Sequence, residues 1–535
     1  MPGTDSLKHT RSPFFWRILA MSLIGCATLL RILYLMFGHA IDLSPDEAHY
    51  WDWSRHLDWS YYSKGPLVAW LIRASCELFG NEMFAVRLPA ILCGALTLVG
   101  LYRLTLLVFR RDSLACGVVA ACLTMPLIHA GSVLMTIDAP FICAWTWALV
   151  AGYFAIIEER RWAWPMLGII IAIGILSKYT MLLVPGCMVL FLLMTPGYRR
   201  TLISLRFLSM IGIASLGWVP IVVWNIQHDW VSFRHVATQA GVYEFNVGKV
   251  LFRWNGPLVM LGGQFALLLG FWFVVWILAL FRFSPWREPS ERVRYLWWCS
   301  FPVFATFAGF SFLTGVQANW PAPAYLAGLI LAVSWLSEHW SSRFVRVGFI
   351  ASSILGSIAS GLIYDFRPVR PLLVALSKPP SEEQPLPARW IDPTCRARGW
   401  RELAEVVDQC RDAMRMSGQE PFLLASGWNT PGELGFYCKE HPQAYTFGKL
   451  LGDRSSQYDL WHPNPIADAQ AFVGKSFVYV GPQIPLMELA FERVEGPIVF
   501  EYREENIPLA RWQVWKCYGC KGFDLFEGWS QKNRY

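Results

Sequence analysis

The chain reads Ser44-Pro45-Asp46-Glu47-Ala48-His49-Tyr50-Trp51 where it leaves an apolar run at 18–37 that is long enough to span a bilayer. Ionisable groups at such a depth are costly and therefore usually functional. Ser44 suits an N-cap, Pro45 the first helical position and Glu47 the third, which predicts a capping box. Glu47 then binds the backbone N–H of Ser44, whereas Asp46 has no such structural role. We therefore predict that Asp46 is the acid that performs chemistry.

The composition is that of a polytopic membrane protein. Of the 535 residues, 55% are hydrophobic, 15% aromatic and only 16% charged, which is too apolar for a soluble enzyme. Apolar length predicts about eleven transmembrane segments of roughly 20 residues. They lie near 18–38, 87–109, 114–133, 138–157, 163–177, 180–194, 202–224, 257–281, 295–314, 321–337 and 344–363. Ser177-Lys178-Tyr179 interrupts the short fifth and sixth segments, so one bent hairpin is an alternative there.

Basic residues predict the orientation, because cytoplasmic loops are enriched in Lys and Arg. With the N-terminus at 1–17 in the cytoplasm, the basic pairs at 110–111, 160–161 and 199–200 all fall on the cytoplasmic side. The opposite loops are longer and hold few basic residues, among them Lys64 and Lys178. We therefore expect a multi-pass protein of the cell (inner or plasma) membrane. Asp46, Asp138 and the C-terminal region would face the extracytoplasmic side.

A second domain is expected after the last membrane segment. The transmembrane domain would span 18–363 with an outer loop at 39–86, and a proline-rich linker would follow at 364–395. At 396–535, helical periodicity at 403–410 and strand-like runs at 422–425 and 477–480 predict a soluble extracytoplasmic α/β domain. The net charge of +7 then comes from the membrane part. It reflects topology, and we expect no nucleic-acid partner.

Thirteen cysteines are present, five of them in the outer domain: Cys395, Cys410, Cys438, Cys517 and Cys520. An odd number in an oxidising compartment allows some pairing and leaves one thiol over. Structural disulfides, unpaired buried thiols, and metal or redox chemistry at Cys517-Tyr518-Gly519-Cys520 are the three alternatives.

The outer loop at 39–86 is more than a connection. An apolar stretch at 67–79 is too short to span, so two helices are expected at the membrane surface. The loop is rich in aromatic residues, which could form an interfacial belt or a platform for a sugar face. They are Trp51, Trp53, Trp59, Tyr61 and Tyr62.

Asp138 starts the fourth apolar segment on the same side as Asp46. An aspartate there either caps the helix or supports a general base. Lys64, Arg87 and Lys178 also belong to the outer side, where cations either extend toward lipid phosphate or together capture a phosphate group. Arg31 lies within the first segment, where it either extends outward, which we expect, or helps to hold a lipid phosphate.

Trp224-Asn225-Ile226-Gln227-His228-Asp229-Trp230 opens a second long outer loop. A His-Asp pair can bind a metal ion or move protons, but no third ligand at metal-site spacing is visible, so no metal residue is predicted. The chain contains no phosphate-binding loop, no dinucleotide-binding glycine pattern and no metalloprotease or serine-hydrolase motif. If the chain is an enzyme, its activated substrate must come from the membrane, because nucleotide sugars and ATP are scarce on the outer side.

These motifs resemble the GT-C glycosyltransferases of the family 39/83 type. That group contains protein O-mannosyltransferases, lipid A aminoarabinose transferases and rhizobial galacturonosyltransferases. The resemblance covers 18 to about 363 and is most specific at 44–53, Tyr61-Tyr62-Ser63-Lys64-Gly65-Pro66 and Arg87-Leu88-Pro89. Thr136-Ile137-Asp138-Ala139-Pro140, Ser177-Lys178-Tyr179-Thr180, Gln227-His228-Asp229-Trp230 and Ala318-Asn319-Trp320-Pro321 are similar to later family motifs.

The resemblance implies an inverting enzyme that moves a sugar from a polyprenyl phosphate to a hydroxyl-bearing acceptor on the outer face. Asp46 would activate the acceptor hydroxyl, Asp138 would support it, and Lys64 and Lys178 would hold the donor phosphate. The other substrate-binding residues implied are Glu47, His49, Tyr62, Arg87, Tyr179, His228 and Asp229. No cofactor is predicted, and a divalent cation is left open.

Two departures from the family pattern matter. Ser63 stands before Lys64, where the aminoarabinose transferases carry a glutamate, and Lys64-Gly65-Pro66 replaces a Lys-Pro-Pro pattern. The first departure argues against aminoarabinose as the sugar and against a metal site built on that glutamate. The rival interpretation of the whole chain is a lipid-linked sugar flippase or transporter, although the internal repeats common in transporters are not evident.

Overall fold

The structure is a computed structural model that describes residues 12–37, 41–239, 252–376, 386, 388–484 and 487–523. The chain folds into two compact units. Unit 1 holds the residues up to Met36 together with Leu88–Ser360, and unit 2 joins Phe37–Arg87 to Gly361–Tyr535. The outer loop that carries Asp46 therefore belongs to the same compact unit as the C-terminal domain. The sequence had not predicted this grouping.

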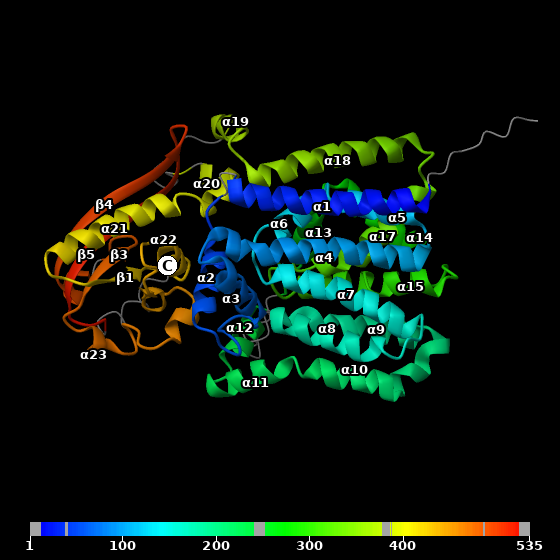
Figure 1. The fold of residues 1–535 in the computed structure, drawn as a ribbon, viewed down its shortest axis with the longest axis horizontal. Helices are drawn as coiled ribbons and strands as arrows, with labels where there is room; N and C mark the ends of the chain where they lie inside the picture. The colour runs from blue at the N-terminus through cyan, green and yellow to red at the C-terminus, as the bar shows by residue number, and fades with distance from the viewer. Residues whose placement is uncertain are drawn as a thin grey trace, which may run out of the picture. The chain divides into compact units, whose positions relative to one another are not determined.

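Unit 1 is helical, as Figure 1 shows. Its elements are α1 (Pro13–Phe37), α4 (Met83–Phe109), α5 (Asp112–Cys122), α6 (Pro126–Gly131), α7 (Asp138–Ile156), α8 (Ala163–Ser177), η1 (Tyr179–Leu182), α9 (Leu183–Met194), η2 (Pro196–Ile203), α10 (Leu205–Ser215), α11 (Trp218–Gln227), α12 (Val231–Gln239), α13 (Gly256–Leu267), α14 (Phe271–Arg282), α15 (Glu291–Trp298), α16 (Phe301–Phe310), α17 (Ala322–Glu338) and α18 (Arg343–Tyr364). The first residues of α4 and the last of α18 are counted with unit 2.

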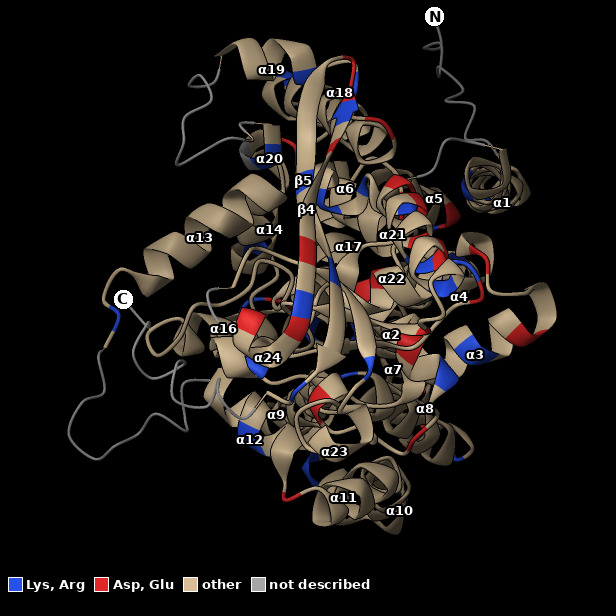
Figure 2. Cartoon of the chain, turned by 90° about the vertical axis from the view of Figure 1, so that its left-hand side faces the viewer, with Lys and Arg blue, Asp and Glu red and all other residues tan. Residues whose placement is uncertain are grey.

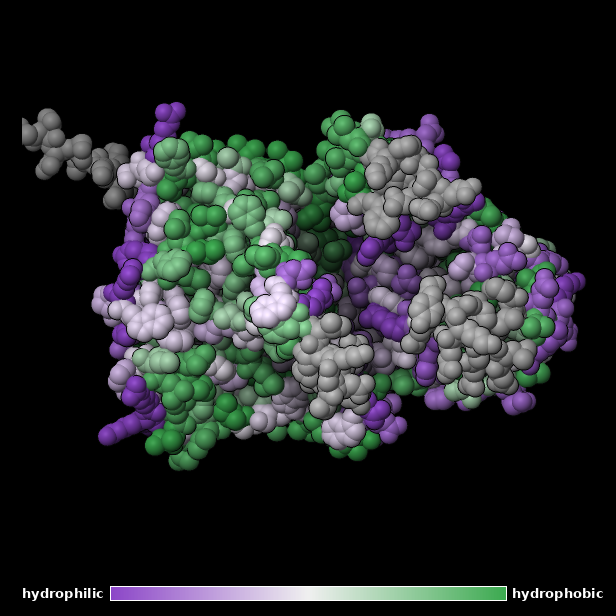
Figure 3. Space-filling view, turned by 180° about the vertical axis from the view of Figure 1, so that it is seen from behind, coloured by the Kyte–Doolittle hydropathy of each residue, from purple (hydrophilic) through white to green (hydrophobic). Residues whose placement is uncertain are grey.

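The outward faces of these helices are apolar. Leu30 on α1, Leu258 on α13 and Phe344 on α18 are all exposed, and Figure 3 shows hydrophobic side chains over much of the visible surface of the helical unit. In Figure 2 the ribbon of α13 carries no charged residue. Water would not tolerate so much exposed apolar surface, whereas lipid does. Unit 1 is therefore the membrane-embedded part of the protein.

The expected membrane segments are all helical where the structure describes them, but several are short or broken. Five helices are long and apolar enough to cross a bilayer: Pro13–Phe37, Met83–Phe109, Asp138–Ile156, Leu205–Gln227 and Arg343–Tyr364. The pair α13–α14 is bent by 110° and would make a sixth. This is fewer than the eleven predicted from apolar runs. Some of the missing segments are apolar helices of only 10–17 residues, such as Ala163–Ser177 and Ala322–Glu338. Others are broken, as between α15 and α16, because a run of apolar residues does not reveal where a helix ends.

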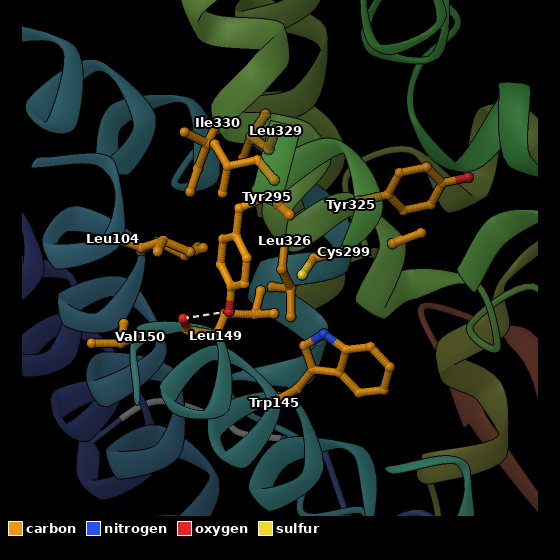
Figure 4. Close-up of a cluster of buried hydrophobic side chains, with 14 of the residues drawn as sticks. Leu104, Trp145, Leu149, Val150, Tyr295, Cys299, Tyr325, Leu326, Leu329 and Ile330 are labelled. Carbon is orange, nitrogen blue, oxygen red and sulfur yellow. Dashed lines mark hydrogen bonds between the residues drawn. The ribbon is translucent and has the colours of Figure 1, made fainter. Parts of the chain in front are cut away.

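The core of unit 1 is packed around buried aromatic side chains, some of which Figure 4 shows. The hydroxyl of Tyr295 donates to the carbonyl of Leu149 at 2.9 Å, with Leu104, Trp145 and Leu326 nearby in the same cluster. A tyrosine hydroxyl in such surroundings needs a partner, because an unpaired polar group in an apolar core is destabilising. This bond ties α15 to α7.

Unit 2 is an α/β structure (Figure 1). Its elements are α2 (Pro45–Arg55), α3 (Leu67–Phe79), α19 (Arg370–Leu376), α20 (Ala388–Ile391), η3 (Pro393–Ala397), α21 (Trp400–Met416), β1 (Pro421–Ala425), α22 (Pro431–Tyr437), β2 (Ala444–Thr446), η4 (Gly448–Leu451), η5 (Gln457–Asp459), α23 (Ala469–Phe472), β3 (Ser476–Val480), α24 (Met487–Ala490), β4 (Phe491–Glu504) and β5 (Ile507–Cys520). The strand order is β2-β1-β3-β5-β4. Strand β1 pairs in parallel with β2 and β3, and β5 pairs antiparallel with β3 and β4.

The predicted helix and strands of the C-terminal domain are confirmed. Helix α21 buries Leu403, Val407 and Cys410 on one face, and the runs at 422–425 and 477–480 are β1 and β3. The hairpin β4–β5 was not predicted. Its two turn residues, Glu505 and Asn506, both have positive φ, as a tight two-residue hairpin turn requires.

Part of the predicted linker is folded. Helices α19 and α20 lie within 364–395, while 377–385 and 387 lie outside the described residues. The buried guanidinium of Arg370 binds Asp392 at 2.7 Å and Glu504 at 2.6 Å. The pair with Glu504 holds α19 against β4, and the pair with Asp392 ties α19 to the residue before η3, so the segment is not a bare connection.

Helix α22 packs closely on α2, the helix that carries Asp46. A Cβ atom at Gly432 would lie 2.7 Å from the carbonyl carbon of Ala48 and 2.8 Å from the backbone nitrogen of His49. Only glycine allows the two backbones to approach in this way. This contact brings the C-terminal domain to the helix that holds the predicted base.

Candidate active site

The local structure around Asp46 is the one that the sequence predicts. Ser44 caps α2, its hydroxyl accepting from the backbone N–H of Glu47 at 3.4 Å, and the Glu47 carboxylate accepts from the backbone N–H of Ser44 at 2.9 Å. The capping box is confirmed. Asp46 sits in the first turn with an exposed side chain.

Glu47 has a second structural role that the sequence did not reveal. Its carboxylate accepts two hydrogen bonds of 2.8 Å from Arg87, and both side chains are fully buried. Arg87 also donates to the carbonyls of Ile41 and Asp42 at 2.9 and 2.8 Å. The pair thus fixes the start of α2. Its geometry makes both residues positioning residues, and a direct contact of either with substrate stays a prediction.

A cavity of about 110 Å³ lies beside α2, within unit 2, and is called the polar pocket below. Its lining residues are Asp46, His49, Tyr50, Tyr62, Ser63, Lys64, Trp428, Arg454, Ser455 and Ser456. The structure therefore brings together Asp46, His49, Tyr62 and Lys64, four of the predicted site residues. The backbone N–H of Tyr62 donates to Gln457 at 2.7 Å, which fixes the 62–64 segment against the C-terminal domain.

Sequence reasoning missed the other side of this pocket. Trp428 lies in the loop after β1, and Arg454–Ser456 lie in the loop after η4. These residues lie 382 to 410 positions after Asp46, in the C-terminal domain. An Arg beside small hydroxyl residues is too common a pattern to mark a site, so no local signal could have found it.

His49 is neutral at physiological pH. Burial lowers the pKa of His49 to about 3, and the positive charge of Arg454 acts in the same direction. The indole N–H of Trp53 donates to His49 Nε2 at 3.1 Å, so the neutral ring carries its proton on Nδ1. This Nδ1 has no hydrogen-bond partner among the described residues.

The aromatic residues of the outer loop are mainly structural. Trp51, Trp53 and Tyr61 are fully buried, and Trp53 stacks on Tyr61 with ring centroids 4.3 Å apart. The two proposed roles, an interfacial belt and a sugar platform, are therefore wrong for these three. Trp59 is exposed, and Tyr62 is the aromatic residue of this set that lines the polar pocket.

Asp138 lies in unit 1 and does not cap α7. Its carboxylate accepts from Lys178 Nζ at 2.7 Å and from Asn319 Nδ2 at 2.6 Å. Asp138 and Asn319 line a cavity of about 280 Å³, called the apolar cavity below, whose other lining residues are mostly hydrophobic. The resemblance had assigned Lys178 to the donor phosphate, but here it is held by Asp138. Its backbone is extended and separates α8 from η1, as the predicted interruption requires.

The remaining predicted substrate-binding residues of unit 1 have packing contacts. The His228 ring stacks on Trp224 with centroids 3.9 Å apart, and Asp229 follows with a positive φ in an exposed turn. Tyr179 packs between Trp218 and Phe233. None of the three lines the apolar cavity. Their contact with substrate stays a prediction.

The cysteines and Arg31 have defined environments in the structure. All thirteen cysteines are free thiols, and the five of the C-terminal domain are buried. Arg31 is 2% exposed, so the expectation that it extends outward is wrong. No group of three or more His, Cys, Asp or Glu in the described part of the chain could hold a metal ion.

Comparisons with known proteins agree with the motifs. The family model of dolichyl-phosphate-mannose-protein mannosyltransferases matches residues 63–224. The lipid A galacturonosyltransferase RgtD of Rhizobium johnstonii is 32% identical over 319 residues, which are 58% of this chain and 64% of that protein. The undecaprenyl phosphate-alpha-4-amino-4-deoxy-L-arabinose arabinosyl transferase of Yersinia pestis is 26% identical over 151 residues, 25% of this chain and 27% of its own. The matches span less than two thirds of either relative.

Solved structures agree with the fold. The crystal structure of ArnT from Cupriavidus metallidurans in the apo state superposes with a TM-score of 0.59 at 16% identity, over 94% of this chain and 98% of that chain. The structure of the same protein bound to undecaprenyl phosphate gives the same values. In its sequence matches, its helical unit and its C-terminal α/β unit, the chain is similar to GT-C glycosyltransferases.

Proposed function

We propose that the chain transfers a sugar from a polyprenyl-phosphate donor to a hydroxyl-bearing acceptor at the extracytoplasmic face of a bacterial inner membrane. The observation that carries this proposal is the polar pocket, in which the Asp46 carboxylate and the Lys64 ammonium line one small space. A carboxylate supplies a base, and an ammonium compensates the negative charge of a leaving phosphate.

The proposed reaction is a single displacement. The acceptor oxygen attacks the anomeric carbon, the bond from that carbon to the phosphate oxygen breaks, and polyprenyl phosphate leaves with the bonding electrons. Asp46 takes the proton of the acceptor hydroxyl, and Lys64 binds the phosphate. The Glu47–Arg87 pair supports this role indirectly, because it leaves Asp46 exposed in the first turn of a helix whose start is fixed. His49 is neutral and adds no charge.

Unit 1 suits the lipid part of such a donor. The apolar cavity has Asp138, Asn319 and Thr136 among otherwise largely hydrophobic lining residues. We propose that this cavity takes part of the prenyl chain of the donor. The related ArnT has been solved with undecaprenyl phosphate bound, which is consistent with a lipid-phosphate substrate.

The similar proteins do not all transfer the same sugar. The names of the two relatives specify an acidic galacturonosyl and a basic 4-amino-4-deoxy-arabinosyl group, so charge is the property that separates them. The acceptor is a lipid A in one of these names. For this chain we propose only a hydroxyl on a membrane-associated glycolipid or glycan.

The test is turnover by purified protein. Radiolabelled polyprenyl-phosphate sugars are incubated with the protein and a membrane-lipid extract, and released polyprenyl phosphate is measured. Asp46→Asn should lower the rate at least about 100-fold, the usual contribution of a general base. Asp412→Asn, which removes a half-exposed carboxylate of α21 in the same unit, is the matched control and should keep wild-type turnover.

Two results would contradict the proposal. If Asp46→Asn kept wild-type turnover, Asp46 would not be the general base. Relocation of the labelled lipid across vesicle membranes, without release of polyprenyl phosphate, would instead identify a flippase.

A further inference from the structure

The charged side chains that line the polar pocket carry a net positive charge. Lys64 and Arg454 are cationic, Asp46 is anionic, and His49 is neutral. If one cation meets the donor phosphate and Asp46 acts as base, the other cation still faces the same small space. A ligand that brings a second negative charge would complement the pocket, whereas an amino sugar would be repelled.

Arg454 is oriented by its neighbours. Its guanidinium carbon lies 4.0 Å from the centroid of the Trp428 ring. The carboxylate of Asp453 accepts from the backbone N–H groups of Arg454 and Trp428, at 2.8 and 3.4 Å, and so ties the two loops together. A guanidinium stacked on an aromatic face keeps its in-plane N–H groups available for a planar acid.

The guanidinium of Arg454 forms no ion pair with a carboxylate among the described residues. By contrast, Arg493 on β4 has the same stacking distance, 4.0 Å to the Tyr518 ring, and does pair with Glu495 at 3.5 Å. Arg454 thus has the stacking that positions a guanidinium and lacks, within the described part of the chain, the ion pair that would occupy it.

His49 also lines the polar pocket. It is 6% exposed, and its Nδ1–H is buried without a partner among the described residues. Because the ring is neutral, it offsets neither of the two cations.

We propose that Arg454, presented by the C-terminal domain, is the specificity residue of this enzyme and binds the carboxylate of a uronic acid as the donor sugar. This inference rests on the proposed function, because it assumes that the sugar of a polyprenyl-phosphate donor enters the polar pocket. It gives the C-terminal domain a role, which is to recognise the acidic group of the sugar. A planar carboxylate matches the fork of a guanidinium in two parallel hydrogen bonds.

The test compares two donors that differ only at C6 of the sugar. Radiolabelled undecaprenyl-phosphate galacturonate and undecaprenyl-phosphate galactose are each bound to the full-length protein in detergent without acceptor, and the two Kd values are measured. The wild type should prefer the uronate by about 10- to 100-fold, the usual worth of hydrogen bonds to a charged group. Arg454→Met should abolish this preference and leave the Kd for the galactose lipid unchanged.

Two further variants define the result. Arg454→Lys keeps the charge but loses the fork, so it should retain a smaller preference for the uronate. Arg493→Met removes an arginine with the same stacking distance outside the pocket and should bind both lipids like the wild type. Melting temperatures of all variants show whether unit 2 remains folded.

The outcomes separate the two proposals. Equal wild-type affinity for both lipids, or a uronate preference that survives in Arg454→Met, would overturn the role of Arg454. So would an equal loss of affinity for both lipids, because Arg454 would then bind the phosphate common to them. The binding measurement needs no turnover, so failure of the transferase assay contradicts the proposed function separately.

Discussion

Breaking the buried pair of Glu47 and Arg87 should destabilise unit 2 strongly. In Arg87→Met the carboxylate of Glu47 loses two hydrogen bonds of 2.8 Å, and the carbonyls of Ile41 and Asp42 lose one donor each. Both charged side chains are fully buried, so water cannot replace these bonds. Removing one partner of a buried pair costs about 3–5 kcal/mol.

The expected change is large enough to measure directly. For a unit of this size, about 3–5 kcal/mol corresponds to roughly 6–20 °C in Tm. The five thiols of the C-terminal domain are buried, so in detergent a thiol-reactive dye would report its unfolding as labelling above the level of the native protein. Arg73→Met, which breaks an exposed ion pair with Glu77 on α3, is the control and should change the free energy of unfolding by less than about 1 kcal/mol.

A double variant distinguishes the lost pair from a general packing defect. In Arg87→Met with Glu47→Gln the glutamine can still accept from the backbone N–H of Ser44, but the uncompensated charge is gone. We expect the double variant to melt above Arg87→Met alone. If Arg87→Met melted within about 2 °C of the wild type, far below the shift that the lost pair should produce, the pair would not fix α2 as described.

Two further substitutions test the contact between α2 and α22. Both carboxylate oxygens of Glu433 are buried without a partner among the described residues, and burial raises the pKa of this carboxyl well above 4.5. Between pH 4.5 and the raised pKa the native state keeps a proton that the unfolded chain releases, so wild-type stability falls by about 1.4 kcal/mol per pH unit. Glu433→Gln should flatten this fall, which melting temperatures at about pH 5 and about pH 8 would show; an unchanged slope would mean that Glu433 ionises normally. Gly432→Ala places a Cβ 2.7 Å from the carbonyl carbon of Ala48. It should lower the free energy of unfolding by about 1–3 kcal/mol and weaken donor binding. A variant with the wild-type Kd and Tm would refute the close approach of the two helices.

The local predictions were confirmed because they depend on neighbours in sequence. The capping box of α2 is set by residues 44–47, and the interruption at Lys178 by a polar residue between two apolar runs. The face of α21 follows from helical periodicity. Each of these features involves groups within a few positions of one another, so a single sequence displays them.

The predictions that failed concern which neighbours a side chain meets in three dimensions. Trp51, Trp53 and Tyr61 have the composition of an interfacial belt, yet packing within unit 2 buries them. The partner of Arg87 is Glu47, 40 residues earlier, which the sequence did not indicate; a contact of Arg87 with substrate stays a prediction. Sequence patterns state that a residue is aromatic or cationic, but the partner that uses this property is chosen by packing.

By itself, the sequence determined the membrane character of the chain, the α/β character of its C-terminal domain and the position of Asp46 at the start of a capped helix. Only the tertiary structure joined the 37–87 loop to that domain and placed Arg454 and Trp428 beside Asp46 and Lys64. The physical reason is that helix caps and periodicity are short-range interactions. The pocket, in contrast, depends on shape and charge complementarity between segments such as Tyr62 and Gln457, which are 395 residues apart.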